Sequence, residues 1–165
     1  MNILIIGSGG REHAIAMALS KSPIKNQLFA LPGNPGINEY CECIDIDPSN
    51  FREIKNFSKN NNIDLVIVGP EVPICEGITD YLKEYKIDVF APSLEASKLE
   101  SSKKFTKEIA FENNIPTGEA KWFDNYADAC LYLEKLEAPY VIKADGLAAG
   151  KGVAICEDLS GAKNS

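Results

Sequence analysis

Two lysines and three glycines stand close together near the end of the chain, and their spacing is suited to binding an anion. Residues 140–152 read Tyr-Val-Ile-Lys-Ala-Asp-Gly-Leu-Ala-Ala-Gly-Lys-Gly. Lys143 follows a short apolar run that predicts a buried β-strand, and Lys151 lies within the glycine-rich segment. Glycines leave backbone N–H groups free to approach a ligand, and the two ammonium groups add positive potential. The pattern therefore predicts a strand, a lysine and a loop that covers a polyphosphate.

A Walker A loop is the nearest alternative, and the spacing excludes it. That motif places four residues between its first Gly and the Gly-Lys pair, followed by a Ser or Thr that binds the metal. Here three residues separate Gly146 from Gly150, and Gly152 stands at the Ser/Thr position. A flexible hairpin turn with two solvated lysines is the other alternative. We favour the phosphate loop, because a plain turn rarely needs so many glycines and lysines together.

A second glycine loop, at residues 7–10, lies between an apolar run and a helical pattern. A dinucleotide-binding G-x-G-x-x-G fingerprint would need a glycine at position 12, where the chain has Glu12. It would also need an acid after the second strand to hold the ribose, and residues 31–33 supply none. An NAD enzyme is therefore a poor fit. The loop and the helix N-terminus, with Arg11 and His13 just inside it, are still able to hold a phosphate.

The composition excludes several classes of partner. The 165 residues are 45% hydrophobic and 25% charged, as is usual for a globular protein. A net charge of −7 argues against nucleic acid, whose phosphates need a basic surface. No apolar run reaches the roughly 20 residues of a membrane helix, and the N-terminus resembles a first strand rather than a signal peptide. We therefore expect a cytoplasmic protein that binds neither nucleic acid nor membrane.

The five cysteines form no recognisable framework. Cys41 and Cys43 are spaced as in some metal or redox sites, but a single histidine leaves no matching second half. On a strand both thiols would lie on one face, so we interpret them as small buried side chains. The odd number of cysteines also favours reduced thiols.

The elements that must position these loops alternate between strands and helices. Five apolar runs predict strands, at residues 3–6, 28–31, 43–46, 64–68 and 88–91. Helical patterns lie between them; Asp47 is expected to cap one of these helices, with Pro48 as its first residue. Continuously apolar strands that alternate with helices predict an α/β fold with a parallel sheet covered on both faces. Ligands bind such sheets beyond the carboxyl ends of the strands.

The pattern changes at residues 92–100, where we place a domain boundary. Beyond it the sequence predicts a helix at residues 101–113, a strand at 119–123 and a helix at 126–136, followed by the strand, loop and strand that contain Lys143. Residues 157–165 look like the start of another helix. The chain therefore holds one sheet domain and the beginning of a second domain.

Motifs in both parts resemble those of the phosphoribosylamine–glycine ligase family, also called the glycinamide ribonucleotide synthetases. The two long motifs are Gly7-Ser8-Gly9-Gly10-Arg11-Glu12-His13-Ala14 and Lys143-Ala144-Asp145-Gly146-Leu147-Ala148-Ala149-Gly150-Lys151-Gly152-Val153. Three shorter ones lie between them in the family's order: Gly33-Asn34-Pro35-Gly36, Gly69-Pro70-Glu71-Val72-Pro73 and Ser102-Lys103-x-Phe105-x-Lys107. The long motifs are specific and the short ones add weight by their order, so the resemblance covers nearly the whole chain.

The resemblance implies a fold and a reaction. Residues 1–100 would form a Rossmann-like, parallel-sheet pre-ATP-grasp domain, and residues 101–165 the first, incomplete part of an ATP-grasp domain. Members of the family use ATP to phosphorylate the carboxylate of glycine, and the amine of 5-phosphoribosylamine then attacks the acyl phosphate. The products are glycinamide ribonucleotide, ADP and phosphate, in purine biosynthesis.

The resemblance also implies roles for residues of this chain. Lys103 and Lys143 would bind the phosphates of ATP. The loop that closes over these phosphates would contain Gly146, Ala149, Gly150, Lys151 and Gly152. The phosphoribosylamine side would be formed by Gly9, Gly10, Pro70 and Glu71. No catalytic residue is assigned, and Mg²⁺ or Mn²⁺ would be held by ligands beyond this chain.

Family members are longer than this chain, so we expect an N-terminal fragment that is inactive alone as a ligase. Two other functions stay open. One is another ATP-grasp carboxylate–amine ligase of purine or carboxylation metabolism, and the other is a non-catalytic binding module that keeps the sheet domain. Release of ADP that depends on a particular substrate separates the two kinds of enzyme.

Overall fold

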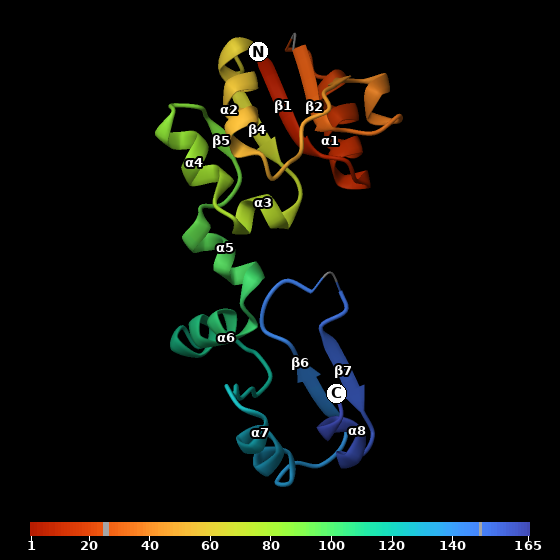
Figure 1. Cartoon of the computed structure of the whole chain (residues 1–165), viewed down its shortest axis with the longest axis vertical. Helices are drawn as coiled ribbons and strands as arrows, with labels where there is room; N and C mark the ends of the chain where they lie inside the picture. Colours follow the sequence, from red (N-terminus) through yellow and green to blue (C-terminus); the bar gives the residue numbers. More distant parts are fainter. Residues whose placement is uncertain (25–26, 149) are drawn as a thin grey trace. The chain divides into compact units, whose positions relative to one another are not determined.

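The computed structural model describes residues 1–24, 27–148 and 150–165 (Figure 1). By their internal contacts these residues form two compact units, Met1–Ser97 (unit 1) and Lys98–Ser165 (unit 2). Unit 1 contains a five-stranded sheet and unit 2 a two-stranded one. No helix within the described ranges is long and apolar enough to cross a membrane.

Unit 1 is built on a parallel sheet with the strand order β3-β2-β1-β4-β5. Its strands are β1 (Asn2–Gly7), β2 (Gln27–Pro32), β3 (Glu42–Cys43), β4 (Leu65–Val68) and β5 (Val89–Phe90). In the central register, Ile5 of β1 pairs with Ala30 of β2 and with Ile67 of β4. The chain therefore adds strands first on one side of β1 and then on the other. Such a reversal opens a crevice at the carboxyl ends of the two strands, and the predicted parallel α/β fold is confirmed.

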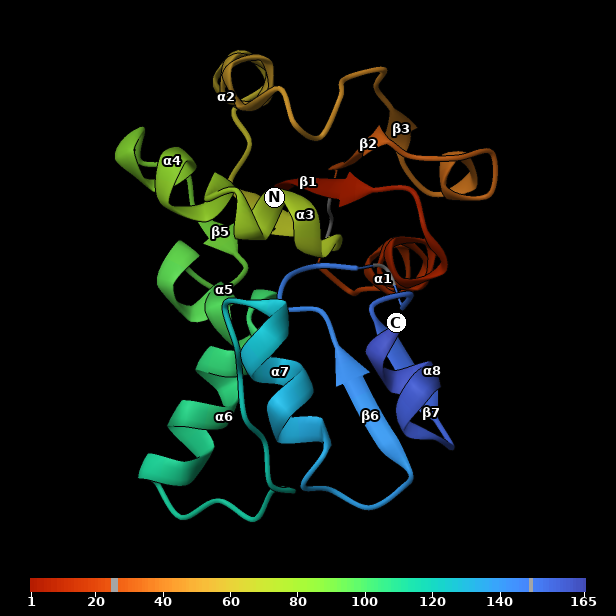
Figure 2. The ribbon, with the colours of Figure 1, turned by 60° about the horizontal axis from the view of Figure 1, so that its bottom comes forward.

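Helices cover both faces of this sheet, as Figure 2 shows for α1 and α2. The helices of unit 1 are α1 (Gly10–Ser20), the 3-10 helix η1 (Ile37–Glu39), α2 (Phe51–Asn60), α3 (Glu71–Cys75) and α4 (Ile78–Glu84). Leu4 and Ile6 of β1 pack with α2 and α4 on one face. Ile3 and Ile5 alternate with them and pack with α1 and η1 on the other. Because both faces are covered, every residue of the run is apolar, which is the pattern that predicted this strand.

The start of α2 differs from the prediction. The helix begins at Phe51 instead of Pro48, and the side chain of Asn50 caps it by accepting a hydrogen bond from the first turn. Asp47 does not cap the helix. Its carboxylate accepts hydrogen bonds from the N–H and the hydroxyl of Ser49, at 2.8 and 2.7 Å. These local bonds close a turn around Asp47, and the chain needs that turn before it can enter the helix.

Strand β3 is shorter than predicted; Cys41 lies directly before it and Cys43 is its last residue. The expected strand at residues 43–46 keeps only its first residue in β3, because Ile46 N–H bonds to the carbonyl of Ile44 at 2.9 Å and turns the backbone away from β2. Cys41 is buried, and the half-buried Cys43 packs against the same apolar cluster. Both are free thiols, which confirms their interpretation as small core side chains.

Unit 2 consists of helices and one antiparallel hairpin. Its elements are α6 (Lys103–Glu112), α7 (Tyr126–Leu133), β6 (Tyr140–Lys143), β7 (Val153–Cys156) and α8 (Leu159–Lys163), with α5 (Leu94–Ser101) crossing the boundary between the units. The helix predicted at residues 101–113 is α6, and α5 was not predicted. Ser102 separates the two helices, because its backbone is extended and its hydroxyl caps α6 by accepting a bond from Phe105 N–H at 3.1 Å.

The predicted strand at residues 119–123 is wrong. The structure has no strand between α6 and α7. The Lys107 ammonium donates instead to the Thr117 hydroxyl and the Gly118 carbonyl, at 2.7 and 2.6 Å. Side-chain bonds to α6, and not a β-ladder, therefore hold the beginning of this extended segment.

The expectation that the strand before Lys143 is buried is also wrong. Tyr140 and Ile142 face a small apolar cluster formed with α7 and α8. Their neighbours alternate to the other face, where Val141 is 51% exposed and its partner Ile155 is 68% exposed. A run of apolar residues thus marks a strand here, but only one of its faces is covered among the described residues.

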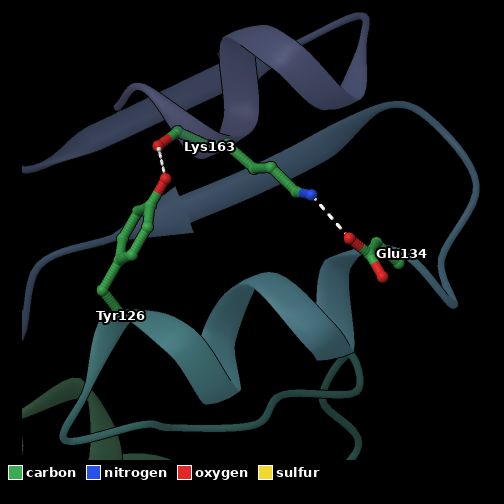
Figure 3. A network of polar contacts seen from close by, with 3 residues as sticks. All are labelled: Tyr126, Glu134 and Lys163. Atoms are coloured by element: carbon green, nitrogen blue, oxygen red, sulfur yellow. Dashed lines mark hydrogen bonds and ion pairs between the residues drawn. The ribbon is translucent and has the colours of Figure 1, made fainter.

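Two polar contacts join α7 and α8 (Figure 3). The Lys163 ammonium forms an ion pair with Glu134 at 2.6 Å, and the Tyr126 hydroxyl donates to the Lys163 carbonyl at 3.0 Å. These contacts lie beside the apolar cluster that includes Ala162 of α8. They hold α8 in place on the covered face of the hairpin. They do not touch the loop that joins β6 to β7, which is held by other residues.

Candidate functional site

Three glycine-containing loops meet at the carboxyl edge of the sheet in unit 1. They follow β1, β2 and β4, at residues 7–10, 33–36 and 69–73. Gly33 N–H bonds to the Gly7 carbonyl at 3.2 Å, and the Asn34 side-chain amide donates to the Ser8 carbonyl at 2.7 Å. The Arg11 guanidinium donates to the Gly69 carbonyl. The loops after β2 and β4 are thus both fastened to the segment that runs from β1 into α1.

Glu12 fills the space at the centre of these loops. Its side chain is 5% exposed, and its carboxylate accepts a bond from Gly9 N–H at 2.7 Å. A Cβ atom added at Gly69 would lie 1.9 Å from Glu12 Oε1, and one added at Gly7 would lie 2.7 Å from Glu12 Cγ. Only glycine therefore fits where β1 and β4 pass this carboxylate. Glu12 caps α1 from its third position while it sets how closely the two loops approach.

A pocket of about 630 Å³ opens beside these loops. Its lining comes from the segments after β1, after β4 and before α2, and comprises Gly7, Ser8, Gly9, Gly10, Arg11, Glu12, Pro32, Asp47, Pro48, Ser49, Pro70, Glu71, Val72, Pro73 and Glu76. Four of these side chains are acidic and one, Arg11, is basic. A small polar ligand with hydroxyl or amine donors would suit these carboxylates, and the helix N-termini of α1 and α3 would suit an anionic part.

The electrostatics of the pocket differ from the simple anion cradle that its glycines suggest. Gly9 N–H already donates to Glu12, so it is not available to a ligand. Pro70 precedes α3 and has no N–H, and Glu71 is the first residue of that helix. Hydrogen bonds from the N–H and hydroxyl of Ser49 hold the pKa of Asp47 below its ordinary value, so this acid is ionised at neutral pH.

The lysine-containing loop of unit 2 is closed at its base. Ala144 N–H donates to the Gly152 carbonyl at 2.9 Å, directly after the pairing of Lys143 with Val153. Within the loop Gly146 and Gly150 have φ angles of +113° and +77°, a region that other residues rarely adopt. The loop conformation therefore requires glycine at these two positions.

The ammonium groups of this loop are accessible. Lys143 and Lys151 are both exposed, and no ion-pair partner of either is found among the described residues. Ala149, predicted to belong to the phosphate loop, lies outside the described residues. The two exposed ammonium groups and the glycine loop can together bind a polyphosphate.

Lys103 meets this loop from the first turn of α6. Its ammonium donates to the Gly146 carbonyl at 3.1 Å, and its backbone N–H donates to the Asp145 carboxylate at 2.6 Å. Asp145 also accepts bonds from the Ser102 hydroxyl at 3.0 Å and from Lys104 N–H at 3.3 Å. The fold thus brings Lys103 and the loop after Lys143 together although 43 residues separate the two hydrogen-bonded positions.

The predicted site residues fall into two groups, one in each unit. Gly9, Gly10, Pro70 and Glu71 line the pocket of unit 1. Lys103, Lys143, Gly146, Gly150, Lys151 and Gly152 lie at or near the hairpin loop of unit 2. His13 is not among the pocket residues; its ring lies 5.7 Å from that of Tyr40.

Sequence reasoning missed two acids that organise these groups, Glu12 and Asp145. Glu12 breaks the dinucleotide fingerprint and belongs to the motif at residues 7–14, but neither pattern gives its side chain a role. A glutamate three residues after a possible helix cap is also a capping signal, and it was available in the sequence. For Asp145 no local signal existed, because its partners lie at the start of α6.

Family comparisons match the whole chain in two consecutive pieces. Residues 1–100 match the family described as "Phosphoribosylglycinamide synthetase, N domain". Residues 101–165 match "Phosphoribosylglycinamide synthetase, ATP-grasp (A) domain". The chain is 45% identical over 163 residues to a phosphoribosylamine–glycine ligase of Caldanaerobacter subterraneus subsp. tengcongensis, covering 99% of the chain and 39% of that relative. It is 48% identical over 155 residues to the ligase of Mesorhizobium japonicum, covering 94% of the chain and 36% of that protein.

A solved structure of the same kind of ligase is also similar to the chain. The crystal structure of phosphoribosylamine–glycine ligase from Thermotoga maritima superposes with a TM-score of 0.78 at 28% identity, covering 99% of this chain and 38% of that one. The chain therefore spans about two fifths of the length of the curated relatives that it matches.

Proposed function

Because the chain belongs to the phosphoribosylamine–glycine ligase family, we propose that these residues are the N-terminal part of an enzyme that joins glycine to 5-phosphoribosylamine. ATP would be consumed, and glycinamide ribonucleotide, ADP and phosphate formed, as a step of purine biosynthesis. The observation that carries this proposal is the ordered match of both family domains along residues 1–165. We infer that residues 1–100 are the pre-ATP-grasp domain and residues 101–165 the start of the ATP-grasp domain.

We propose that Lys103, Lys143 and the loop of residues 144–152 bind the phosphates of ATP, with Gly146, Ala149, Gly150, Lys151 and Gly152 covering them. The exposed ammonium groups of Lys143 and Lys151, together with the half-buried one of Lys103, would neutralise charge that spreads over the phosphate oxygens as the phosphoryl group moves to the glycine carboxylate. Closure of the loop would exclude water from the acyl phosphate, which hydrolysis would otherwise destroy. The lack of an ion-pair partner for Lys143 among the described residues supports this role, because that cation is free to meet an anion.

We propose that the pocket of unit 1 binds 5-phosphoribosylamine. Glu71 would accept hydrogen bonds from its hydroxyl or amine groups, while Gly10 and Pro70 would shape the wall. Gly9 would act through shape alone, since its N–H is bonded to Glu12. The excess of acids in the pocket supports recognition of the sugar and amine in preference to the phosphate.

Phosphoryl transfer from ATP in such enzymes requires a divalent cation, which neutralises phosphate charge when bound. Residues 1–24, 27–148 and 150–165 bring together no group of three or more His, Cys, Asp or Glu side chains that could hold a metal ion. We propose that the ligands of Mg²⁺ or Mn²⁺ come from the part of the longer relatives that this chain does not span. The five free thiols support a reducing, cytoplasmic setting.

The test is substrate-dependent ADP formation by the longest native product of the gene. We expect ADP release that requires both glycine and 5-phosphoribosylamine. Lys143→Met and Lys103→Met are expected to raise KM for ATP at least tenfold, because each removes a cation from the phosphates. Lys135→Met is the matched control, since Lys135 is an exposed lysine that follows α7 in the same unit.

The other functions predict different results. ADP formation that requires bicarbonate, or a carboxylate other than glycine, would replace the proposal with another ATP-grasp ligase. Binding of nucleotide without turnover under any of these conditions would support a binding module. Equal KM values for all three lysine variants would remove the assigned roles of Lys103 and Lys143.

A further inference from the structure

Asp145 receives an unusual set of donors for a residue at a loop. One carboxylate oxygen accepts from Lys103 N–H at 2.6 Å and from Lys104 N–H at 3.3 Å, and the other accepts from the Ser102 hydroxyl at 3.0 Å. All three donors belong to the first turn of α6 or to its cap. The contact joins two segments that are 41 to 43 residues apart in the sequence.

The start of a helix normally leaves several N–H groups without partners, and the residue before the helix satisfies one or two of them. Ser102 does this for Phe105 N–H. The N–H groups of Lys103 and Lys104 point to Asp145 instead. A carboxylate at this end of a helix is favoured by the helix dipole and by charge-assisted hydrogen bonds. Asp145 therefore completes the cap of α6 from a distant loop.

The side chain of Lys103 also contacts this loop. Its ammonium donates to the carbonyl of Gly146, the residue after Asp145. The backbone and the side chain of Lys103 thus contact two consecutive loop residues. The ammonium must leave the Gly146 carbonyl if it is to bind a phosphate, whereas the backbone bonds to Asp145 do not have to break.

We propose that Asp145 is a positioning residue that anchors the loop of residues 144–152 to α6, so that Lys103 and the loop N–H groups meet the same phosphate group. This inference rests on the proposed function of the loop. It assigns to Asp145 no contact with ATP. Its role is to keep the loop in register with α6 when Lys103 exchanges the Gly146 carbonyl for a phosphate oxygen.

The charge state of Asp145 agrees with this role. Partial burial acts to raise its pKa, but hydrogen bonds from Lys104 N–H, the Ser102 hydroxyl and Lys103 N–H outweigh it, and the Lys103 charge adds to them. The pKa of Asp145 is therefore below its ordinary value, and the anchor is ionised at neutral pH.

Kinetics of the full-length enzyme test the proposal. Asp145→Ala removes every acceptor and is expected to raise KM for ATP about tenfold or more, with KM for glycine unchanged. Asp145→Asn keeps an oxygen for the two N–H groups and an amide that donates to Ser102, so its KM for ATP should stay within about threefold of the wild type. If the alanine variant is not recovered, Asp145→Ser replaces it in the comparison with Asp145→Asn, because a serine side chain is too short to reach all three donors.

The control is Asp158→Ala. Asp158 caps α8 by accepting a bond from Gly161 N–H at 2.7 Å, so its loss weakens a helix cap of the same chemistry in the same unit. Among the described residues Asp158 makes no hydrogen bond or ion pair to the loop after Lys143, and the KM for ATP of the Asp158→Ala variant is expected to equal that of the wild type. A rise equal to that of Asp145→Ala would mean that any weakened cap in this unit acts alike, and would overturn the proposal.

Hydrogen exchange without ATP gives a readout that does not depend on activity. The amides of Lys103 and Lys104 should exchange at least tenfold faster in Asp145→Ala and remain protected in Asp145→Asn. Unchanged protection in the alanine variant, or an unchanged KM for ATP, would overturn the proposal, and so would an asparagine variant as impaired as alanine. If the wild type forms no ADP with glycine, the proposed function fails, and the exchange data with ATP-analogue affinities still decide the role of Asp145.

Discussion

Replacing Gly69 with alanine is expected to destabilise unit 1 by about 2–4 kcal/mol. The new Cβ would lie 1.9 Å from Oε1 and 2.5 Å from Cδ of Glu12. Glu12 cannot retreat easily, because it is 5% exposed and its other oxygen accepts the bond from Gly9 N–H. The variant must either break that bond or move the end of β4. Gly69 does not have a left-handed φ, so backbone strain adds nothing and the contact alone accounts for the loss.

Glu12→Ala tests the same contact from the other side. Alone it should destabilise unit 1 by about 1–3 kcal/mol, since it removes the cap of α1 and leaves a hollow between the loops. In the double variant the alanine at position 69 occupies part of that hollow. The loss of unfolding free energy in the double variant should therefore be about 1–3 kcal/mol smaller than the sum of the losses in the two single variants.

Native-state hydrogen exchange at the amides of β1 measures these losses within unit 1 alone, because the slowest amides of a sheet report its global opening. Gly10→Ala is the control: a Cβ there meets nothing within 4 Å, and the expected change is within about 0.5 kcal/mol. Additive effects of Gly69→Ala and Glu12→Ala would show that the carboxylate does not set the spacing of the loops.

Three further outcomes are expected. Although partial burial acts to raise the pKa of Asp145, its hydrogen bonds hold that pKa below the ordinary 3.8. The protection of the Lys103 amide should therefore stay constant from neutral pH to about pH 4 and weaken only at lower pH, and weakening already at pH 6 would contradict this sign. Burial, with a smaller effect of the Cys43 thiol, raises the pKa of Cys41 to about 11, so at pH 8 only about one Cys41 thiol in a thousand is ionised. Its alkylation by iodoacetamide at pH 8, followed by peptide mass spectrometry, should be at least a hundredfold slower in the folded chain than in the chain unfolded in urea, and equal rates would refute the burial argument. Among the described residues the buried hydroxyl of Thr79 has no hydrogen-bond partner, so Thr79→Val should stabilise unit 1 by about 1 kcal/mol in the same exchange assay, and a loss of stability would contradict this reasoning.

The sheet of unit 1 could be predicted because its strands are covered on both faces. A strand such as Ile3–Ile6 is then apolar at every position, and this signal does not depend on which helix covers which face. The helix predicted at residues 126–136 corresponds to α7. Short elements escaped: α3 and α5 have too few residues, or too weak a pattern, to stand out from a loop.

The errors arose where one local pattern fits two structures. The pair Asp47-Pro48 is common at the start of a helix and also in a turn. Here the two hydrogen bonds that Ser49 donates to the Asp47 carboxylate stabilise the turn. Tyr140, Val141 and Ile142 suggest a buried strand, yet only one face of the hairpin has a neighbour among the described residues. An apolar run shows that a strand is able to be buried. Whether both of its faces are buried depends on which other elements pack against them.

By itself the sequence determined the chemical groups of both candidate sites, because these depend on local properties. The glycines at positions 146 and 150 and the lysines at positions 143 and 151 are given by the sequence, and groups of these types suit an anionic ligand wherever the fold brings them together. Only the tertiary structure decided which groups meet. The carboxylate of Glu12 lies between the ends of β1 and β4, and that of Asp145 caps a helix that begins 42 residues earlier. Contacts over such distances depend on how the elements pack, and no local spacing in the chain records them.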